Sequence, residues 1–199
     1  METKNKTTDS ALLILLKEPF AIHTATSISK SLGVTRQGIW KALNKLAENK
    51  LIRLEPISST KTSTTTIKLN WPNPVTEKTL SLLLTEESLR QQRWRVNFAE
   101  LESYVEFLMI FGSVLNNPKE ANDIDIIAIV EKKNFKAADE ITARIQQTQL
   151  KKIHLVDLTV AELAHELKKP NKVYLDAIKK GIILYGQDNF IKFMAGLTK

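Results

Sequence analysis

Residues 111–130 read FGSVLNNPKEANDIDIIAIV. In this stretch one apolar segment ends at Gly112 and Ser113, and a second apolar segment begins with the acidic residues Asp123 and Asp125. Residues two apart on a β-strand project from the same face, so the two carboxylates are expected side by side while the residue between them points into the core. The stretch therefore predicts two β-strands and a short helix that begins at Ser113.

This spacing is suited to phosphate chemistry. Two carboxylates on one face are ligands for the hard Mg²⁺ ions that also bind nucleotide phosphates. Gly112 lets the backbone come close to a triphosphate, and the start of a helix at Ser113 favours anions. Metal ions would activate an attacking hydroxyl and stabilise the charge that develops on the phosphates. We therefore predict Asp123 and Asp125 as metal ligands, and Gly112 and Ser113 as nucleotide-binding residues.

The order of strand, Gly-Ser, short helix and acidic strand resembles the polymerase beta-like nucleotidyltransferase superfamily, particularly its minimal, antitoxin-like members. The resemblance covers roughly residues 105–185. It implies transfer of a nucleoside monophosphate from a nucleoside triphosphate to a hydroxyl on a protein or nucleic acid, with Mg²⁺.

The family usually places a third carboxylate on the next strand, which is expected here at residues 152–158. In this alignment His154 stands at the acidic position, and Asp157 follows three residues later, on the opposite face of a regular strand. Either Asp157 completes the catalytic set with Asp123 and Asp125 through a bulge or register change, or the metal site is incomplete. Histidine replaces a carboxylate poorly for Mg²⁺, which prefers oxygen ligands.

The first third of the chain carries most of its positive charge. Residues 1–75 contain 11 Lys and Arg against 5 Asp and Glu, whereas the whole chain has a net charge of +7. This concentration predicts a polyanionic partner for the N-terminal part of the chain.

Three helices are expected in that part. Asp9 is predicted to cap the first helix, which Pro19 ends. The second helix spans about 24–32 and is followed by Gly33, a residue typical of the position just after a helix. Thr35 then caps a third helix.

Two strands, at about 51–54 and 65–69, are expected to follow these helices and to enclose a polar Ser/Thr loop. Three helices and a hairpin define a winged helix-turn-helix, and residues 33–43 resemble the recognition segment of winged-helix regulators such as the biotin-repressor group. In this arrangement the third helix enters the major groove of duplex DNA. The predicted DNA-binding residues are Arg36, Gln37, Lys41 and Asn44 on the third helix and Lys61 at the tip of the hairpin.

The predicted fold class is α+β. A winged helix-turn-helix at 9–71 is followed by a helical connector at 75–103, in which a second helix starts at Thr85, and by a small α/β nucleotidyltransferase-like domain with a mixed sheet at 104–199. The sequence Trp-Pro-Asn-Pro at residues 71–74 marks the clearest boundary.

The composition of the chain excludes some kinds of metal site and bears on where in the cell the protein is expected. The chain has no cysteine, which excludes disulfides and thiolate metal sites. No apolar run reaches the roughly 18–20 residues that span a bilayer, and the N-terminus lacks the apolar segment of a signal peptide. A cytoplasmic protein without a membrane partner is therefore expected.

Three functions stay open at this stage. The chain is a DNA-binding nucleotidyltransferase, or a transcriptional regulator whose nucleotidyltransferase-like domain senses nucleotide or dimerises without turnover, or the antitoxin of a toxin–antitoxin pair. The expected partners are double-stranded DNA, a nucleoside triphosphate, a second copy of the chain, and a toxin or other protein acceptor.

Overall fold

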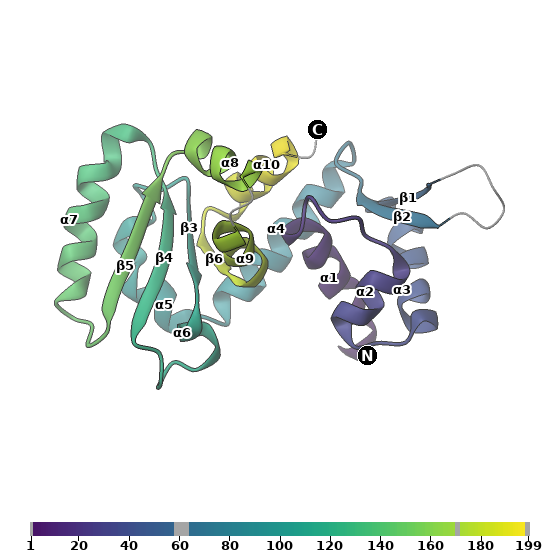
Figure 1. The fold of residues 1–199 in the computed structure, drawn as a ribbon, viewed down its shortest axis with the longest axis horizontal. Helices are drawn as coiled ribbons and strands as arrows, with labels where there is room; N and C mark the ends of the chain where they lie inside the picture. The colour runs from purple at the N-terminus through teal and green to yellow at the C-terminus, as the bar shows by residue number, and fades with distance from the viewer. Residues whose placement is uncertain (1, 58–63, 170–171, 198–199) are drawn as a thin grey trace. The chain divides into compact units, whose positions relative to one another are not determined.

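Figure 1 shows the computed structural model, which describes residues 2–57, 64–169 and 172–197. The chain divides into two compact units, with the division inside helix α4 (Pro74–Leu89), between Leu83 and Leu84. Among the described helices, none combines the length and the apolar character needed to cross a membrane.

The first unit contains three helices, an antiparallel pair of strands and the first part of α4. Its elements are α1 (Glu2–Lys17), α2 (Ala25–Leu32), α3 (Arg36–Glu48), β1 (Ile52–Pro56) and β2 (Thr65–Leu69). The predicted order of these helices and strands is confirmed.

Local hydrogen bonds fix the start of α2 and the turn between α2 and α3. The Thr24 hydroxyl accepts a bond from the N–H of Ser27, and the Ser27 hydroxyl accepts one from the N–H of Thr24, which together form a capping box. Gly33 ends α2 with a φ of 65°, a conformation that glycine adopts without steric cost. Thr35 then caps α3 by accepting a bond from the N–H of Gly38 at 3.1 Å. The start of α3 is therefore set by residues that were recognisable in the sequence.

One face of α3 forms part of the core of this unit. Ile39, Leu43 and Leu46 are buried on α3, together with Leu12 and Leu16 of α1, Ile28 of α2 and Ile67 of β2. Burial of this face leaves the opposite face of α3 in solvent, where polar side chains can contact a partner.

Two predicted helix starts are wrong. Asp9 lies inside α1, which begins at Glu2, and Thr85 lies inside α4, which runs unbroken from Pro74. Both residues are of a type that caps helices, but neither a proline nor a glycine separates them from the residues upstream, so the helix extends past them. After α4, the rest of the predicted connector contains α5 (Gln92–Asn97) and the short 3₁₀ helix η1 (Ala99–Leu101) in place of one continuous helix from Thr85.

The second unit contains the predicted mixed sheet, with the strand order β5–β4–β3–β6. Its strands are β3 (Phe107–Phe111), β4 (Asp123–Ile129), β5 (Lys152–Leu158) and β6 (Ile182–Tyr185). Strand β4 pairs antiparallel with β3 and parallel with β5, and β3 pairs antiparallel with β6.

Helices lie on both sides of this sheet (Figure 1). Besides α5 and η1, whose Trp94 and Leu101 are buried in the core cluster of the sheet, this unit contains α6 (Ser113–Asn116), η2 (Lys132–Asn134), α7 (Phe135–Gln146), α8 (Val160–Lys168), α9 (Lys172–Lys180) and α10 (Gln187–Leu197). Ile124 and Ile126 of β4 are buried in one core cluster with Ile141 and Ile145 of α7. Because side chains alternate along a strand, the residues between and before these isoleucines face the other side of the sheet.

Removal of the hydroxyl that caps α3 tests this description of the first unit. Thr35→Ala is expected to lower the free energy of unfolding by about 1 kcal/mol, because an N–H in the first turn of α3 loses its acceptor. Urea unfolding followed by circular dichroism measures the change. Thr35→Ser keeps the hydroxyl and is the matched control, so an equal loss in both variants would contradict the capping role.

Candidate functional site

The two acidic residues of the sequence motif lie at the start of β4, on one face of the sheet. Oxygen atoms of Asp123 and Asp125 lie within 4.8 Å of each other. Their side chains are 33% and 27% exposed, so both carboxylates are within reach of a dissolved ion or ligand. Ile124 between them is buried, as the alternation of a strand requires.

The end of β3 brings Gly112 against this pair. Phe111 is the register partner of Asp125 in the antiparallel β3–β4 ladder, so Gly112 follows directly beside that residue. Gly112 has a φ of 83°, and a Cβ at this position would lie 2.4 Å from Oδ2 of Asp125. Both the backbone conformation and the space beside the carboxylate therefore require glycine.

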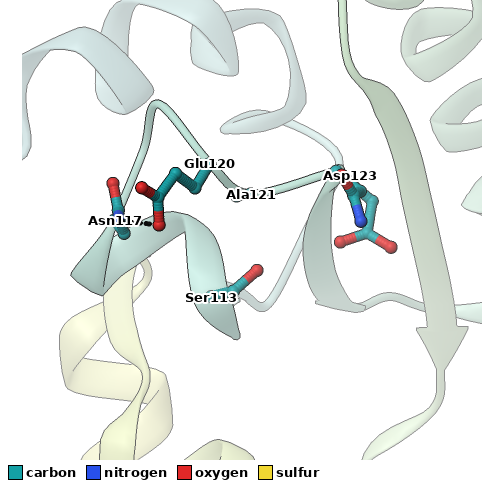
Figure 2. A pocket seen from close by; sticks show the side chains of 6 residues that line it. Ser113, Asn117, Glu120, Ala121 and Asp123 are labelled. Carbon is teal, nitrogen blue, oxygen red and sulfur yellow. Dashed lines mark hydrogen bonds between the residues drawn. The ribbon is translucent and has the colours of Figure 1, made fainter.

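A pocket of about 350 Å³ opens beside Asp123, the first residue of the acidic pair (Figure 2). It is lined by Ser113, Asn117, Glu120, Ala121, Asn122 and Asp123. Ser113 is exposed at the start of α6, and the Asn117 amide donates a hydrogen bond of 2.5 Å to the Glu120 carboxylate. The pocket combines polar donors and acceptors with one carboxylate of the pair.

Lys151, just before β5, binds the loop between α6 and β4, which lines this pocket. Its ammonium donates to the carbonyl oxygen of Lys119 at 3.3 Å and to that of Ala121. The sequence carries no signal for this contact, because the lysine and the loop are far apart along the chain. The contact makes Lys151 a positioning residue for the pocket.

His154 completes a group of three side chains on this face. In the parallel β4–β5 ladder His154 is the register partner of Asp125. Its Nδ1 atom lies 3.4 Å from Oδ2 of Asp123 and 3.4 Å from Oδ1 of Asp125. One ligating atom from each of the three residues lies within 4.8 Å of the others, so the group is able to hold a metal ion.

Asp157, the predicted third catalytic carboxylate, lies outside this group. It is the register partner of Ala128, three residues beyond His154 along β5. The β4–β5 register runs without interruption from Asp123 to Ile129, so the bulge or shift that would bring Asp157 to the acidic pair is absent from this ladder. The structure therefore brings together two acids and a histidine rather than three acids.

The four residues of α3 that are predicted to bind DNA lie on its solvent-exposed surface. Arg36, Gln37, Lys41 and Asn44 are all exposed. Gln37, Lys41 and Asn44 follow one another at intervals of four and three, so they form a row along the helix. Lys61, the predicted contact at the hairpin tip, lies outside the described residues.

Comparison with known families bears on the second unit. Residues 96–190 match the family model Polymerase beta, Nucleotidyltransferase. The matched segment contains Gly112, Ser113, Asp123, Asp125 and His154. The match supports the nucleotidyltransferase part of the predicted architecture, and it does not extend into the first unit. No curated protein and no solved structure matches the chain.

Nucleotidyltransferases usually use a divalent metal ion, commonly Mg²⁺. Mg²⁺ takes oxygen ligands in near-octahedral geometry. Asp123 and Asp125 supply oxygen, but the third position supplies an imidazole nitrogen, which suits transition metals better. The three residues therefore do not fit an all-oxygen Mg²⁺ centre.

Gly112→Ala is expected to displace the Asp125 carboxylate and to weaken binding of a divalent ion by at least about tenfold, an effect typical of changes next to metal ligands. Gly33→Ala is the matched control, because Gly33 has a φ of 65° but no atom within 4 Å of an added Cβ. Gly33→Ala adds about 1–2 kcal/mol of left-handed backbone strain. Gly112 has a ψ of −163°, a region almost reserved for glycine, where a side chain costs about 1–3 kcal/mol. Mn²⁺ titration followed by electron paramagnetic resonance, together with urea unfolding, separates the two effects. Unchanged Mn²⁺ affinity in Gly112→Ala would contradict the assigned role.

Proposed function

We propose that the chain is a DNA-binding protein whose nucleotidyltransferase domain transfers a nucleoside monophosphate from a nucleoside triphosphate to a hydroxyl on a protein or nucleic acid. The observation that carries the proposal is the pair of carboxylates, Asp123 and Asp125, on one face of β4 directly beside Gly112. The family match over residues 96–190 supports the same class of reaction.

In this reaction the acceptor oxygen forms a bond to the α-phosphorus, and the proton of the hydroxyl passes to water. The bond from that phosphorus to the oxygen shared with the β-phosphate breaks, and pyrophosphate leaves with the bonding electrons. The absence of a side chain at Gly112 lets the backbone approach the phosphates. The Ser113 hydroxyl is a donor for a phosphate oxygen. The adjoining pocket of about 350 Å³ falls within the range of small-molecule sites.

The proposal assigns DNA binding to the first unit, as a winged helix-turn-helix. Three observations support it: the order of three helices and an antiparallel hairpin, the exposed row of polar residues on α3, and the basic excess of residues 1–75. In this reading α3 lies in the major groove with its first turn toward the bases. Arg36 then pairs with guanine and Gln37 with adenine, whereas Lys41 and Asn44 extend the contact along the groove.

Arg36→Ala is expected to weaken binding to a preferred duplex roughly 5- to 150-fold, the equivalent of about 1–3 kcal/mol for a lost bidentate contact to a base. The duplex is first selected from a random library with the full-length protein, and affinity is then measured by fluorescence anisotropy at fixed salt concentration. Lys136→Ala removes an exposed charge from α7 in the second unit and serves as the control. Equal affinities for the two variants would remove Arg36 from the interface.

Transfer is tested by incubating the full chain with each of the four labelled nucleoside triphosphates, a divalent ion, and duplex DNA or protein as the acceptor. Label is expected on one acceptor with the native chain and is expected to be absent with Asp125→Asn, which keeps the shape of the side chain but removes its charge. Asp139→Asn alters an exposed acid on α7 and is expected to retain transfer. If no acceptor gains label beyond the Asp125→Asn level with any of the triphosphates, transfer is excluded.

His154 favours a second candidate, a DNA-binding regulator that binds nucleotide without turnover. The reason is the imidazole at the position where nucleotidyltransferases usually carry the third carboxylate. Isothermal titration with nucleoside triphosphate, combined with an assay for pyrophosphate, discriminates the two. Saturable binding without pyrophosphate release supports the regulator, whereas release supports the enzyme. A second copy of the chain and a toxin stay predicted partners under either function.

A further inference from the structure

We infer that Asp123, Asp125 and His154 form a site for one divalent transition-metal ion of the Zn²⁺ type, in preference to Mg²⁺. The inference deepens the proposed function, since it concerns the same face of β4, but it is tested without nucleotide. Three protein donors would hold the ion, and a fourth position would stay open for water or a phosphate oxygen, the pattern of catalytic rather than structural zinc sites.

The spacing of the donor atoms is the first argument. In a tetrahedral zinc site with bonds of about 2.1 Å, neighbouring donors lie about 3.4 Å apart. In an octahedral Mg²⁺ site with bonds of similar length, neighbouring donors lie only about 2.9 Å apart. The Nδ1 atom of His154 lies 3.4 Å from an oxygen of Asp123 and 3.4 Å from an oxygen of Asp125, so these two of the three donor pairs have the tetrahedral spacing. The third pair, the two carboxylate oxygens, lies within 4.8 Å.

The chemistry of the donors is the second argument. Imidazole nitrogen is a good ligand for zinc, iron, nickel and copper, whereas Mg²⁺ selects carboxylate, carbonyl and water oxygen. The two carboxylates and a neutral imidazole together carry two negative charges, which a single divalent ion balances. A cation is also required if a triphosphate is to approach this face, because its charge has the same sign as the two carboxylates.

The backbone holds these donors in place. Asp125 and His154 are register partners in the parallel β4–β5 ladder, and Asp123 lies two residues before Asp125 on the same strand. The side chains remain partly exposed, with His154 43% accessible, so an ion can enter without opening the sheet. A site built on hydrogen-bonded strands keeps its geometry better than one built on loops.

A simple ion pair between a protonated His154 and the two acids is the competing explanation. Hydrogen bonds between charged nitrogen and oxygen groups usually span 2.7–2.9 Å. Both contacts of His154 are longer, at 3.4 Å. The two explanations also differ in outcome, since removal of an imidazolium would leave the carboxylates more available to a cation, whereas removal of a ligand would weaken binding.

The experiment titrates the full-length, nucleotide-free protein with Zn²⁺ against a chromophoric chelator, with Mg²⁺ by calorimetry, and with Co²⁺ by visible absorption. The native chain is expected to bind Zn²⁺ more tightly than Mg²⁺ and to give the intense Co²⁺ spectrum of four-coordinate cobalt. His154→Ala is expected to lower Zn²⁺ affinity at least about tenfold and to abolish that spectrum. His154→Asp is expected to shift the preference toward Mg²⁺.

His165→Ala is the matched control, because His165 is an exposed histidine on α8 in the same unit. It is expected to bind Zn²⁺ and Co²⁺ as the native chain does. Equal or higher Zn²⁺ affinity in His154→Ala would overturn the inference in favour of the ion pair. A weak six-coordinate Co²⁺ spectrum in the native chain would overturn it in favour of an octahedral site of the Mg²⁺ type. Failure of nucleotidyl transfer with these metal titrations intact would refute the proposed enzyme and leave the metal site standing.

Discussion

The candidate site depends on the pairing of β4 with a neighbour on each side. In the antiparallel β3–β4 ladder Phe111 lies opposite Asp125, so the next residue, Gly112, lies beside the Asp125 carboxylate. In the parallel β4–β5 ladder His154 lies opposite the same aspartate. A slip of one residue in β4 would turn its buried isoleucines toward the site and its carboxylates into the core. Burial of an unpaired carboxylate has a high free-energy cost, so a slipped register of β4 is strongly disfavoured and Asp123 and Asp125 stay on the accessible face.

The same constraint explains which parts of the site were predictable from the sequence. The common face of Asp123 and Asp125 follows from the period of a single strand, and the proximity of the Gly-Ser bend follows from two strands joined by a short connection. Whether His154 or Asp157 lies beside the two acids depends on the register between β4 and β5, which are separated along the chain by α7. Local alternation shows only that these two residues face opposite sides of β5. Which of them meets the acids is decided by the β4–β5 ladder.

Among the helices too, some boundaries were predictable from the sequence and others were not. The predictions of Gly33 after the second helix and of Thr35 as the cap of the third are confirmed, because the backbone leaves the helical conformation at each of them. Thr24, the predicted first residue of the second helix, caps α2 instead. Asp9 and Thr85 have the same kind of side chain, but the residues before them continue the helix. A capping side chain stabilises a helix end once the chain turns there, and it does not force that turn. The helix boundaries were therefore predicted correctly where a glycine stands between two helices, with the capping residue close behind it.

Charge explains why the two proposed activities reside in different units. A duplex DNA is a dense polyanion, and its binding requires positive charge on the surface that faces it. The basic excess of the chain lies in residues 1–75, whereas the site of the second unit consists of two carboxylates and an imidazole. Carboxylates on the DNA-facing side of α3 would oppose binding, and lysines among Asp123, Asp125 and His154 would compete with a metal ion for the carboxylates. The basic excess of residues 1–75 thus suits duplex DNA, whereas the two carboxylates of the candidate site suit a metal cation.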